Sequence, residues 1–534
     1  MTTIPGPGLS DAAHPLAAAD DTALAALRAD LRQQVGADQV LLSPEDRAPF
    51  ERDWRGRTAA PALAVALPRT VADVQAVVRW CAAQDVAIVP QGGNTGLCGG
   101  SVPLPGYGRP QLILSLRRLT AIRAIDVDND ALTVEAGVTL LAVQELATRH
   151  GRLFPLSLAS EGSCCIGGNL ATNAGGVQVL RYGNARALVL GLEVVLPDGT
   201  LWNGLRGLRK DNTGYDLKQV FLGAEGTLGI ITAATLRLFP LPAQQQVAWV
   251  GLPSVGAALQ LFHLLRAACG DQLSSFELIG RLPLELALRH LPGTRDPLPD
   301  IHPWQVLVQV DQHTADQLAE QLAALSGPAG FTQAVIAQTE TQAKSLWHLR
   351  EMLSEAQRLE GPNLKHDIAL PQSQLATFIE QAEQRLLALD PAVRIVCFGH
   401  LGDGNLHYNL FPGRSPGSIF SDIPDMPNTT SNRAGADHAI ALGNPATLDA
   451  DHASLSRIVL DLVTELQGSI SAEHGIGQFK TSELARYRDP IELQLMRSLK
   501  QAWDPANRMN PGKVLTLAPL ARTPMAGVPE GALR

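Results

Sequence analysis

Two histidines flank a run of turn-forming residues in a segment that has the pattern of a β-hairpin. In FGHLGDGNLHYNL (398–410), His400 and His407 stand on either side of GDGN (402–405), and Gly, Asp and Asn favour tight turns. In a hairpin the two imidazoles would sit opposite each other on one face. Two imidazoles so placed begin a divalent metal site, whereas a buried, hydrogen-bonded histidine pair is the alternative.

A carboxylate and a third histidine occur further along the chain. The segment SAEHGIG (471–477) supplies Glu473 and His474. Two histidines and one carboxylate that leave coordination positions open are typical of a catalytic metal centre. His474 would then be free to act as a base beside the metal. An isolated Glu-His pair is more often a solvated loop, so this segment alone does not decide the function.

A second group of segments is rich in glycine, so that backbone N–H groups rather than side chains could bind a ligand. PQGGNTGLCGGSVP (90–103) follows an apolar run, and its glycines allow backbone N–H groups to approach an anion closely. It matches neither the dinucleotide-binding GxGxxG nor the P-loop, and by itself could be a tight structural turn. SEGSCCIGGNLATNAGGVQVLRYG (160–183) and DNTGYDLKQVFLGAEGTLGIITAATLRLFP (211–240) are also rich in small residues. Three such segments suit a large, extended ligand held against backbone.

In this order and spacing, the three segments resemble the flavoprotein family named after vanillyl-alcohol oxidase and p-cresol methylhydroxylase, over roughly residues 55–240. The resemblance implies a two-subdomain FAD fold that grips the pyrophosphate between loop 1 (residues 90–100) and loop 2 (residues 161–176). Some relatives bond flavin covalently to a histidine, and loop 1 has none, so we expect a dissociable FAD. The implied FAD-binding residues are Pro90, Gly92, Gly93, Asn94, Thr95, Gly96, Ser101, Glu161, Gly162, Ser163, Gly167, Gly168, Asn173, Gly175, Gly226, Gly229 and Ile230.

The second half of the chain resembles the C-terminal domain of FAD-linked D-2-hydroxyacid dehydrogenases, and most of all the D-2-hydroxyglutarate dehydrogenases. The matching stretches are WHLRE (347–351), KHDIALP (365–371), GHLGDGNLHYN (399–409), SAEHGIG and NPGKVL (510–515). The resemblance implies that His400, His407 and Glu473 bind a divalent metal, usually zinc, and that His474 is the catalytic base. It implies that Arg350, Lys365, Asn409 and Ser354, which stands where relatives often have threonine, contact the substrate.

Taken alone, Arg350 would be a surface residue of a helix and Lys365 a solvated lysine. Within the matched segments they are cations that hold a substrate carboxylate, and a bidentate arginine would also orient it. The metal would bind the carboxylate and hydroxyl of the substrate and lower the hydroxyl pKa. His474 would accept the proton while the C2 hydrogen passes as hydride to flavin N5.

The expected reaction is the oxidation of D-2-hydroxyglutarate to 2-oxoglutarate. A D-lactate or glycolate dehydrogenase is the alternative within the family. A non-catalytic flavin electron-transfer subunit and an aldehyde-lyase-like enzyme, as in ether-lipid synthesis, are rivals from other classes. An electron-transfer flavoprotein, a quinone or a cytochrome would accept the electrons, and no NAD site is visible.

The helices and strands that must position these residues can be predicted from the sequence pattern, which indicates an α+β protein with several domains. Apolar runs predict strands at 62–68, 86–93, 304–310 and 394–400, and helical periodicity predicts a helix over 71–84 with Thr70 as N-cap. The expected division is a disordered tail (1–20), an FAD-binding domain of the p-cresol methylhydroxylase type (21–240), a substrate (cap) domain with an antiparallel sheet (241–470) that contains a mobile insertion (412–450), a C-terminal helical segment that completes the active site (471–516) and a second disordered tail (517–534).

Bulk properties exclude several classes of function. At 534 residues the chain is too long for one core, and its net charge of −9 argues against a nucleic-acid partner. We find no signal or transit peptide and no apolar run of about 18 residues that could span a membrane. The six cysteines form no CxxC pair, so we expect reduced thiols in a cytoplasmic protein. Peripheral association with the inner membrane and a homodimer are left open.

Overall fold

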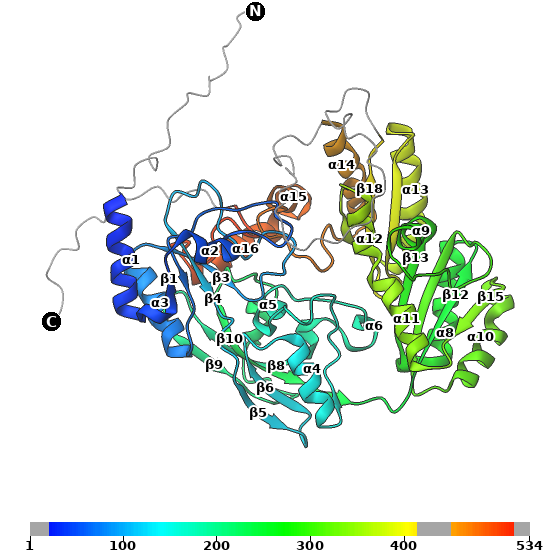
Figure 1. The fold of residues 1–534 in the computed structure, drawn as a ribbon, viewed down its shortest axis with the longest axis horizontal. Coiled ribbons are helices and arrows are strands. Elements are labelled where there is room, and N and C mark those ends of the chain that lie inside the picture. Colours follow the sequence, from blue (N-terminus) through cyan, green and yellow to red (C-terminus); the bar gives the residue numbers. More distant parts are fainter. Residues whose placement is uncertain (1–20, 414–449, 517–534) are drawn as a thin grey trace, which may run out of the picture.

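The computed structural model describes residues 21–413 and 450–516. The tails expected at 1–20 and 517–534, and nearly all of the insertion expected at 412–450, lie outside the described residues. Helices and strands are mixed along the described chain, and the strands form sheets in two halves of the molecule (Figure 1). The α+β class is therefore confirmed.

A small four-stranded sheet forms the first half's N-terminal part, in the order β1-β2-β4-β3. Strands β2, β4 and β3 are parallel, and β1 pairs with β2 antiparallel. The helix expected over 71–84 is confirmed as α3 (Val71–Ala83), because Thr70 accepts a hydrogen bond from the Asp73 N–H while Asp73 accepts one from the Thr70 N–H. The strand expected at 62–68 is confined to β2. The bounds are α1 (Asp21–Val35), β1 (Val40–Leu41), α2 (Pro44–Glu51), β2 (Val65–Ala66), β3 (Ala87–Gln91) and β4 (Gln111–Ser115).

A five-stranded antiparallel sheet completes this first half, in the order β5-β6-β10-β8-β9. We call it the FAD half, after the FAD-binding domain expected at 21–240. Its core packs α4 and α5 against β6, β8 and β10, and a two-stranded ladder of β7 and β11 lies beside it. The bounds are β5 (Ile122–Asp126), β6 (Ala131–Glu135), α4 (Leu140–Arg149), β7 (Arg152–Leu153), α5 (Ile166–Ala171), α6 (Val179–Tyr182), β8 (Val189–Val195), β9 (Leu201–Gly204), α7 (Lys218–Phe221), β10 (Ile230–Arg237) and β11 (Phe239–Pro240).

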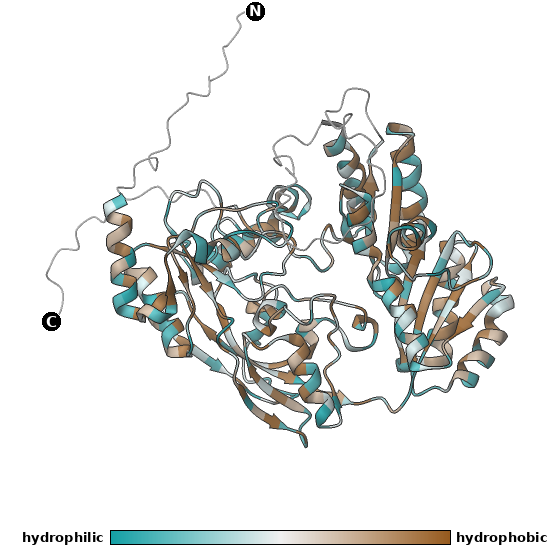
Figure 2. Cartoon of the chain, viewed as in Figure 1, coloured by the Kyte–Doolittle hydropathy of each residue, from teal (hydrophilic) through white to brown (hydrophobic). Residues whose placement is uncertain are grey.

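A seven-stranded antiparallel sheet organises the second half, in the order β15-β12-β14-β13-β17-β18-β16. Helices α8, α10, α13 and α14 cover one face, and α9, α11 and α12 cover the other. Because both faces are covered, the central strands are apolar along most of their length (Figure 2). The bounds are β12 (Gln245–Leu252), α8 (Val255–Cys269), β13 (Leu273–Gly280), α9 (Arg281–His290), β14 (Trp304–Asp311), α10 (Ala315–Ala329), β15 (Gln333–Ile336), α11 (Glu340–Glu351), α12 (Leu353–Glu360), β16 (Asp367–Ala369), α13 (Leu375–Leu389), β17 (Arg394–His400), β18 (Asn405–Phe411) and α14 (Ala450–Glu465).

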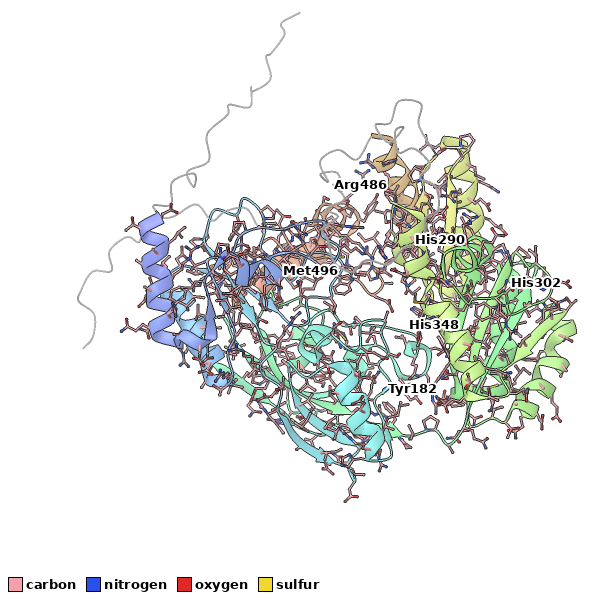
Figure 3. All side chains as sticks on the ribbon, in the orientation of Figure 1. Tyr182, His290, His302, His348, Arg486 and Met496 are labelled. Carbon is pink, nitrogen blue, oxygen red and sulfur yellow. The ribbon has the colours of Figure 1, made fainter. Side chains whose placement is uncertain are left out.

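The end of the described chain returns to the FAD half, so that segments far apart in sequence lie together (Figure 1). Helices α15 (Thr481–Tyr487) and α16 (Pro490–Trp503) precede a segment in which Asn510 N–H donates to Ile88 O at 2.7 Å. A second link runs from α6, where the Tyr182 hydroxyl, labelled in Figure 3, donates to Asp311 Oδ2 of β14 at 3.4 Å. No helix of the described residues has the length and apolar character needed to cross a membrane.

Candidate active site

Strands β17 and β18 form the expected hairpin, but its register differs from the expected one. His407 lies opposite Phe398, and His400 stands two positions further along β17. The two imidazoles therefore share one face, as expected, but are diagonal neighbours with ring centroids 5.8 Å apart. The turn is longer than a minimal one because a 3₁₀ turn, Leu401–Asp403, separates the strands.

Each histidine of the hairpin lies directly opposite a carboxylate on the next strand. His400 of β17 pairs in register with Glu277 of β13, and His407 of β18 pairs with Asp367 of β16. The sheet order β13-β17-β18-β16 thus sets two acids outside and two imidazoles inside on one face. Cross-strand neighbours on one face are close enough to interact directly, so this row defines the centre of the site.

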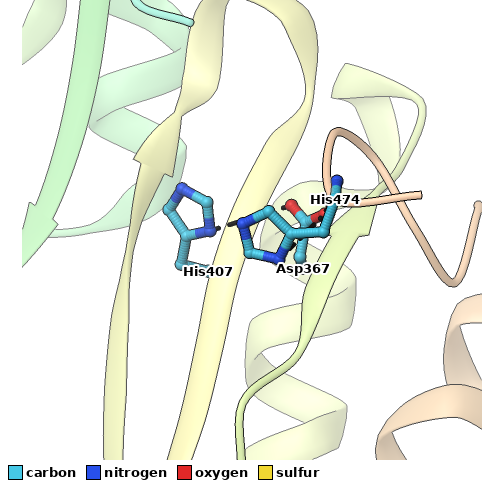
Figure 4. A group of neighbouring side chains, drawn as sticks. All are labelled: Asp367, His407 and His474. Atoms are coloured by element: carbon cyan, nitrogen blue, oxygen red, sulfur yellow. Dashed lines mark hydrogen bonds and ion pairs between the residues drawn. The ribbon is translucent and has the colours of Figure 1, made fainter. Parts of the chain in front are cut away.

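The three residues expected to bind metal are brought together. One ligand atom each from His400, His407 and Glu473 lies within 4.8 Å of the others, and His400 Nε2 is 3.6 Å from Glu473 Oε1. Asp367, His407 and His474 form a second such group (Figure 4), in which His407 is shared. Two imidazoles and a carboxylate are a donor set that suits zinc and related divalent cations.

Glu277 fixes the orientation of His400. Its Oε1 lies 2.8 Å from His400 Nδ1, so Nδ1–H donates to it and Nε2 is left facing Glu473. Burial acts to lower the pKa of His400, but Glu277 and Glu473 outweigh burial and raise that pKa to about 9. A metal ligated through Nε2 would have to displace the proton on Nε2, because only the neutral imidazole binds a cation.

Asp367 holds the segment that carries His474. Its Oδ2 accepts hydrogen bonds from the backbone N–H groups of Glu473 and His474, both at 2.9 Å, and lies 3.5 Å from His474 Nδ1. Burial lowers the pKa of His474 to about 4 although Asp367 acts to raise it. At neutral pH His474 is therefore uncharged, which is the protonation state that a general base requires.

Arg350 is not a free cation. Its Nε and Nη2 donate to Glu277 Oε2 at 3.0 and 2.6 Å, and the guanidinium lies over the Phe398 ring at 5.0 Å. Because one carboxylate already takes up its fork, Arg350 is tied to His400 through Glu277. Its expected role as a direct clamp on a substrate carboxylate stays a prediction.

Lys365 is a cation at the site that no described residue pairs with. It precedes β16, is partly buried, and makes no side-chain hydrogen bond or ion pair with any described residue. Burial, followed by repulsion from Arg55 and Arg57, lowers the pKa of Lys365 to about 8. A partly buried ammonium among like charges is a favourable place for an anion.

The other two residues expected at the substrate, Asn409 and Ser354, differ in their surroundings. Asn409 is buried, with Oδ1 accepting from the His366 N–H at 3.0 Å and Nδ2 donating to Gln357 Oε1 at 2.8 Å. Ser354 is exposed on α12. The substrate contacts expected of both residues stay predictions.

Loops 1 and 2 touch each other through glycines. A Cβ on Gly93 would lie 2.2 Å from Ser163 O, and one on Gly92 would lie 3.5 Å from the Gly168 N. The Gly93 contact leaves no room for a side chain, whereas a Cβ on Gly92 would make an ordinary van der Waals contact. The close approach of the two backbones at Gly93 suits a cradle of N–H groups for an anion. Asn94 ties loop 1 to neighbouring backbone, because its amide donates to Arg52 O at 2.9 Å and accepts from Ser101 Oγ at 2.8 Å.

The FAD half also holds the metal-binding candidates in place. Gly176 N–H of loop 2 donates to Glu473 Oε1 at 2.7 Å, and a Cβ on Gly175 would overlap that oxygen at 2.4 Å. In the third segment (211–240) Glu225 accepts from the Ile476 and Gly477 N–H groups at 2.7 and 2.8 Å. Gly167, Gly229 and Ile230 are buried in packing contacts, so their expected FAD contacts remain predictions.

Sequence reasoning missed Glu277, Asp367 and Glu225. A signal existed for Glu277, because it is an acid within SSFELIG (274–280), an otherwise uncharged run that forms a fully buried strand. Buried carboxylates are rare unless paired. Asp367 stood inside a matched stretch without a role, and Glu225 among the glycines of the third segment gave no separate signal.

Comparison with known families covers both halves. Residues 62–204 match the model described as "FAD binding domain", and residues 241–419 and 436–514 match "FAD linked oxidases, C-terminal domain". The chain is 38% identical over 487 residues to a D-2-hydroxyglutarate dehydrogenase of Xanthomonas citri pv. viticola, covering 91% of this chain and 96% of the relative. It is 36% identical to the mitochondrial enzyme of Bos taurus, covering 90% and 82%. A putative mitochondrial D-lactate dehydrogenase of Schizosaccharomyces pombe is 33% identical, covering 88% and 85%.

Solved structures agree on the fold at low sequence identity. A p-cresol methylhydroxylase with bound substrate matches with a TM-score of 0.68 and 18% identity, covering 92% of this chain and 96% of that one. An alkyldihydroxyacetonephosphate synthase matches with a TM-score of 0.64 and 16% identity, covering 90% and 84%. The glycine cradle, the histidine site and these relationships agree: the chain belongs to the FAD-linked oxidase family, as an FAD-dependent D-2-hydroxyacid dehydrogenase.

Proposed function

We propose that this dehydrogenase oxidises D-2-hydroxyglutarate to 2-oxoglutarate at a divalent metal site formed by His400, His407 and Glu473. The observation that carries the proposal is the row Glu277–His400–His407–Asp367, which faces Glu473 and the neutral His474. The names of the Xanthomonas and bovine relatives support the substrate.

Each absent group would supply one kind of chemistry. FAD, when bound, accepts two electrons as a hydride, and the metal would act as a Lewis acid that polarises the substrate hydroxyl. His400 Nε2, an imidazole nitrogen of His407 and a Glu473 carboxylate oxygen would hold the metal. Glu277 would keep His400 in the tautomer with Nε2 free, as partners of ligating histidines generally do.

His474 is proposed as the base that takes the proton of the C2 hydroxyl. Its Nδ1 lies beside Asp367 Oδ2, so Nε2 is the nitrogen free to accept. Asp367 would stabilise the imidazolium that forms, and its two backbone hydrogen bonds fix the position of His474. The proton would thus be held next to a carboxylate in a buried site, where the interaction is stronger than in water.

Lys365 is proposed as the residue that receives the distal carboxylate of the substrate. It is an unpaired cation near the site, with Arg55 and Arg57 beside it, whereas the charge of Arg350 is neutralised by Glu277. A dicarboxylate hydroxy acid fits this arrangement better than a monocarboxylate does. Arg350 would contribute indirectly, through the Glu277–His400 pair.

The substrate is tested by anaerobic bleaching of the flavin with D-2-hydroxyglutarate, D-lactate, D-malate, glycolate and the L enantiomers. We expect D-2-hydroxyglutarate to reduce the flavin fastest and its L enantiomer to be inert. Faster reduction by D-lactate or glycolate would assign the chain to the alternative within the family, to which the putative D-lactate dehydrogenase of Schizosaccharomyces pombe belongs by name.

The metal is tested by chelation. Treatment with a chelator followed by buffer exchange should abolish flavin reduction, and added zinc or manganese should restore it while the FAD content stays constant. A chelator-resistant enzyme that contains no metal by elemental analysis would remove the metal from the proposal. The electron acceptor, the homodimer and the cytoplasmic location stay predictions.

A further inference from the structure

Two buried lysines near the end of the described chain have opposite surroundings. The Lys500 ammonium donates to Thr227 O at 2.7 Å, Asp504 Oδ2 at 2.6 Å and Met509 O at 2.8 Å. Lys513 is only 2% exposed, yet its ammonium has no hydrogen-bond partner within the described residues. Burial lowers the pKa of Lys513 to about 7, although Glu225 acts to raise it. A buried amine without a partner is unfavourable, so it points to a group that the chain itself does not supply.

The segment that carries Lys513 is fastened to the FAD half on several sides. Asn510 Nδ2 donates to Gly100 O at 2.9 Å and to Glu225 O at 2.7 Å. Val514 N–H donates to Gly477 O at 2.9 Å. Lys513 therefore lies where the far end of loop 1, the third segment and the segment that carries His474 meet.

Loop 1 has two ends with different partners. At its start, Gly92 and Gly93 contact loop 2, which forms the backbone cradle expected to hold the pyrophosphate. At its far end, Cys98 O accepts from the Gln478 N–H at 2.9 Å and Gly100 O accepts from Asn510. The far end is thus next to the segment that carries His474. A base acts on substrate beside the redox ring, so the far end of loop 1 marks the ring end of FAD.

We propose that the Lys513 ammonium donates a hydrogen bond to the N1–C2=O edge of the flavin and stabilises negative charge there. When the ring gains two electrons and one proton, a negative charge remains at N1, and a neighbouring cation favours that state. The proposal goes beyond the substrate assignment and rests on the proposed role of His474 only for locating the ring end. Its test uses no hydroxy acid, so it can fail or succeed independently of the proposed function.

Sulfite provides a readout that does not depend on turnover. Sulfite dianion forms an S–N5 bond with oxidised flavin, and the displaced electron pair leaves one negative charge on the sulfonate and one at N1–C2=O. Its dissociation constant therefore reports how well the protein stabilises charge at N1. The two-electron midpoint potential, measured against a reference dye, reports the same stabilisation during reduction.

The variants are Lys513→Met, Lys513→Gln and Lys513→Arg in the full chain with FAD. We expect Lys513→Met and Lys513→Gln to raise the sulfite dissociation constant at least about tenfold and to lower the midpoint potential by about 30 mV, the equivalent of a tenfold change for two electrons. Lys513→Arg, which keeps the charge, should stay within about threefold of the unchanged protein. Lys500→Met is the matched control: it removes a fully bonded buried lysine, so we expect lower thermal stability with unchanged sulfite affinity and potential.

Unchanged sulfite affinity and potential in Lys513→Met or Lys513→Gln would overturn the proposal. An equal shift in Lys500→Met would also overturn it, because the effect would then belong to the packing of the C-terminal segment. If neither neutral variant retains FAD while Lys513→Arg does, the cation serves cofactor retention instead of N1, and the proposal is wrong.

Discussion

Two regions of the molecule are suited to charged groups in opposite ways. One is the cradle formed by loops 1 and 2, and the other is the histidine row of the seven-stranded sheet. In the cradle the important feature is the absence of side chains, since a Cβ on Gly93 would overlap Ser163 O at 2.2 Å. In the row each imidazole faces a carboxylate one strand away, Glu277 for His400 and Asp367 for His407. The cradle should therefore be sensitive to added atoms, and the row to single exchanged atoms.

The largest effect is expected at His474, which faces the row and which we propose carries the proton transfer. His474→Ala should lower the rate of flavin reduction about 10²–10⁴-fold, the usual contribution of a general base, while FAD content stays normal. Stopped-flow reduction and the flavin absorbance per chain check both parts. Reduction within a few-fold of the unchanged protein would exclude His474 as the base.

The cradle should fail in the complementary way. Gly93→Ala forces loop 1 away from loop 2, so we expect the protein to be purified largely without FAD while its histidine site is retained. The control is Gly327→Ala on the exposed side of α10, where an added Cβ meets no atom within 4 Å. Normal FAD content in Gly93→Ala would mean that contact between the loops does not form the cofactor site.

A smaller effect should follow when one atom of the row is exchanged. Glu277→Gln keeps the shape but removes the negative charge and replaces one of the two acceptor oxygens with an NH2 donor, so it cannot accept from both His400 and Arg350. Losing a partner of a ligating histidine typically lowers metal affinity or activity 10–100-fold, and metal titration of the chelated protein measures it. Glu285→Gln is the control, because Glu285 lies on the surface of the neighbouring helix α9 and, among the described residues, its side chain pairs with Arg281 of that helix. Equal metal affinity in both variants would contradict the orienting role of Glu277.

The smallest effect concerns pH and tests the proposed contact between Lys365 and the distal carboxylate of the substrate. The pKa of Lys365 is lowered to about 8, so its charge is present below that pH and is lost as the pH rises through it. KM for D-2-hydroxyglutarate should therefore rise above about pH 8, while KM for D-lactate, which has no second carboxylate, should not follow. Lys365→Met should remove the pH dependence and raise KM for the dicarboxylate at all pH values. A parallel rise for both substrates would assign the titration to another group.

Local sequence predicted the elements well where the signal was local. The capping box at Thr70 and Asp73 begins α3 as expected, and the turn residues between His400 and His407 produce the hairpin. The expected directly opposed histidine pair was wrong, because register is set by the length of the turn and by the neighbouring strands β13 and β16. The strand expected at 62–68 shrank to two residues, since only Val65 and Ala66 find partners in the ladder.

The sequence by itself determined the cofactor family, the residues proposed to bind a metal and the expectation of free thiols, and all six cysteines are free in the structure. Those conclusions depend on residue types and short spacings, which survive in a linear chain. Only the tertiary structure decided that Arg350 is taken up by Glu277, that Lys365 is unpaired, and that Asp367 holds His474. The physical reason is that these partners are set by the order of strands in the sheet: Glu277 and His400 are 123 positions apart, and a cross-strand neighbour carries no mark in the sequence. The cradle and the row thus differ in how far the sequence predicts them. The glycine pattern predicts the cradle, whereas the order of strands in the sheet brings the residues of the row together.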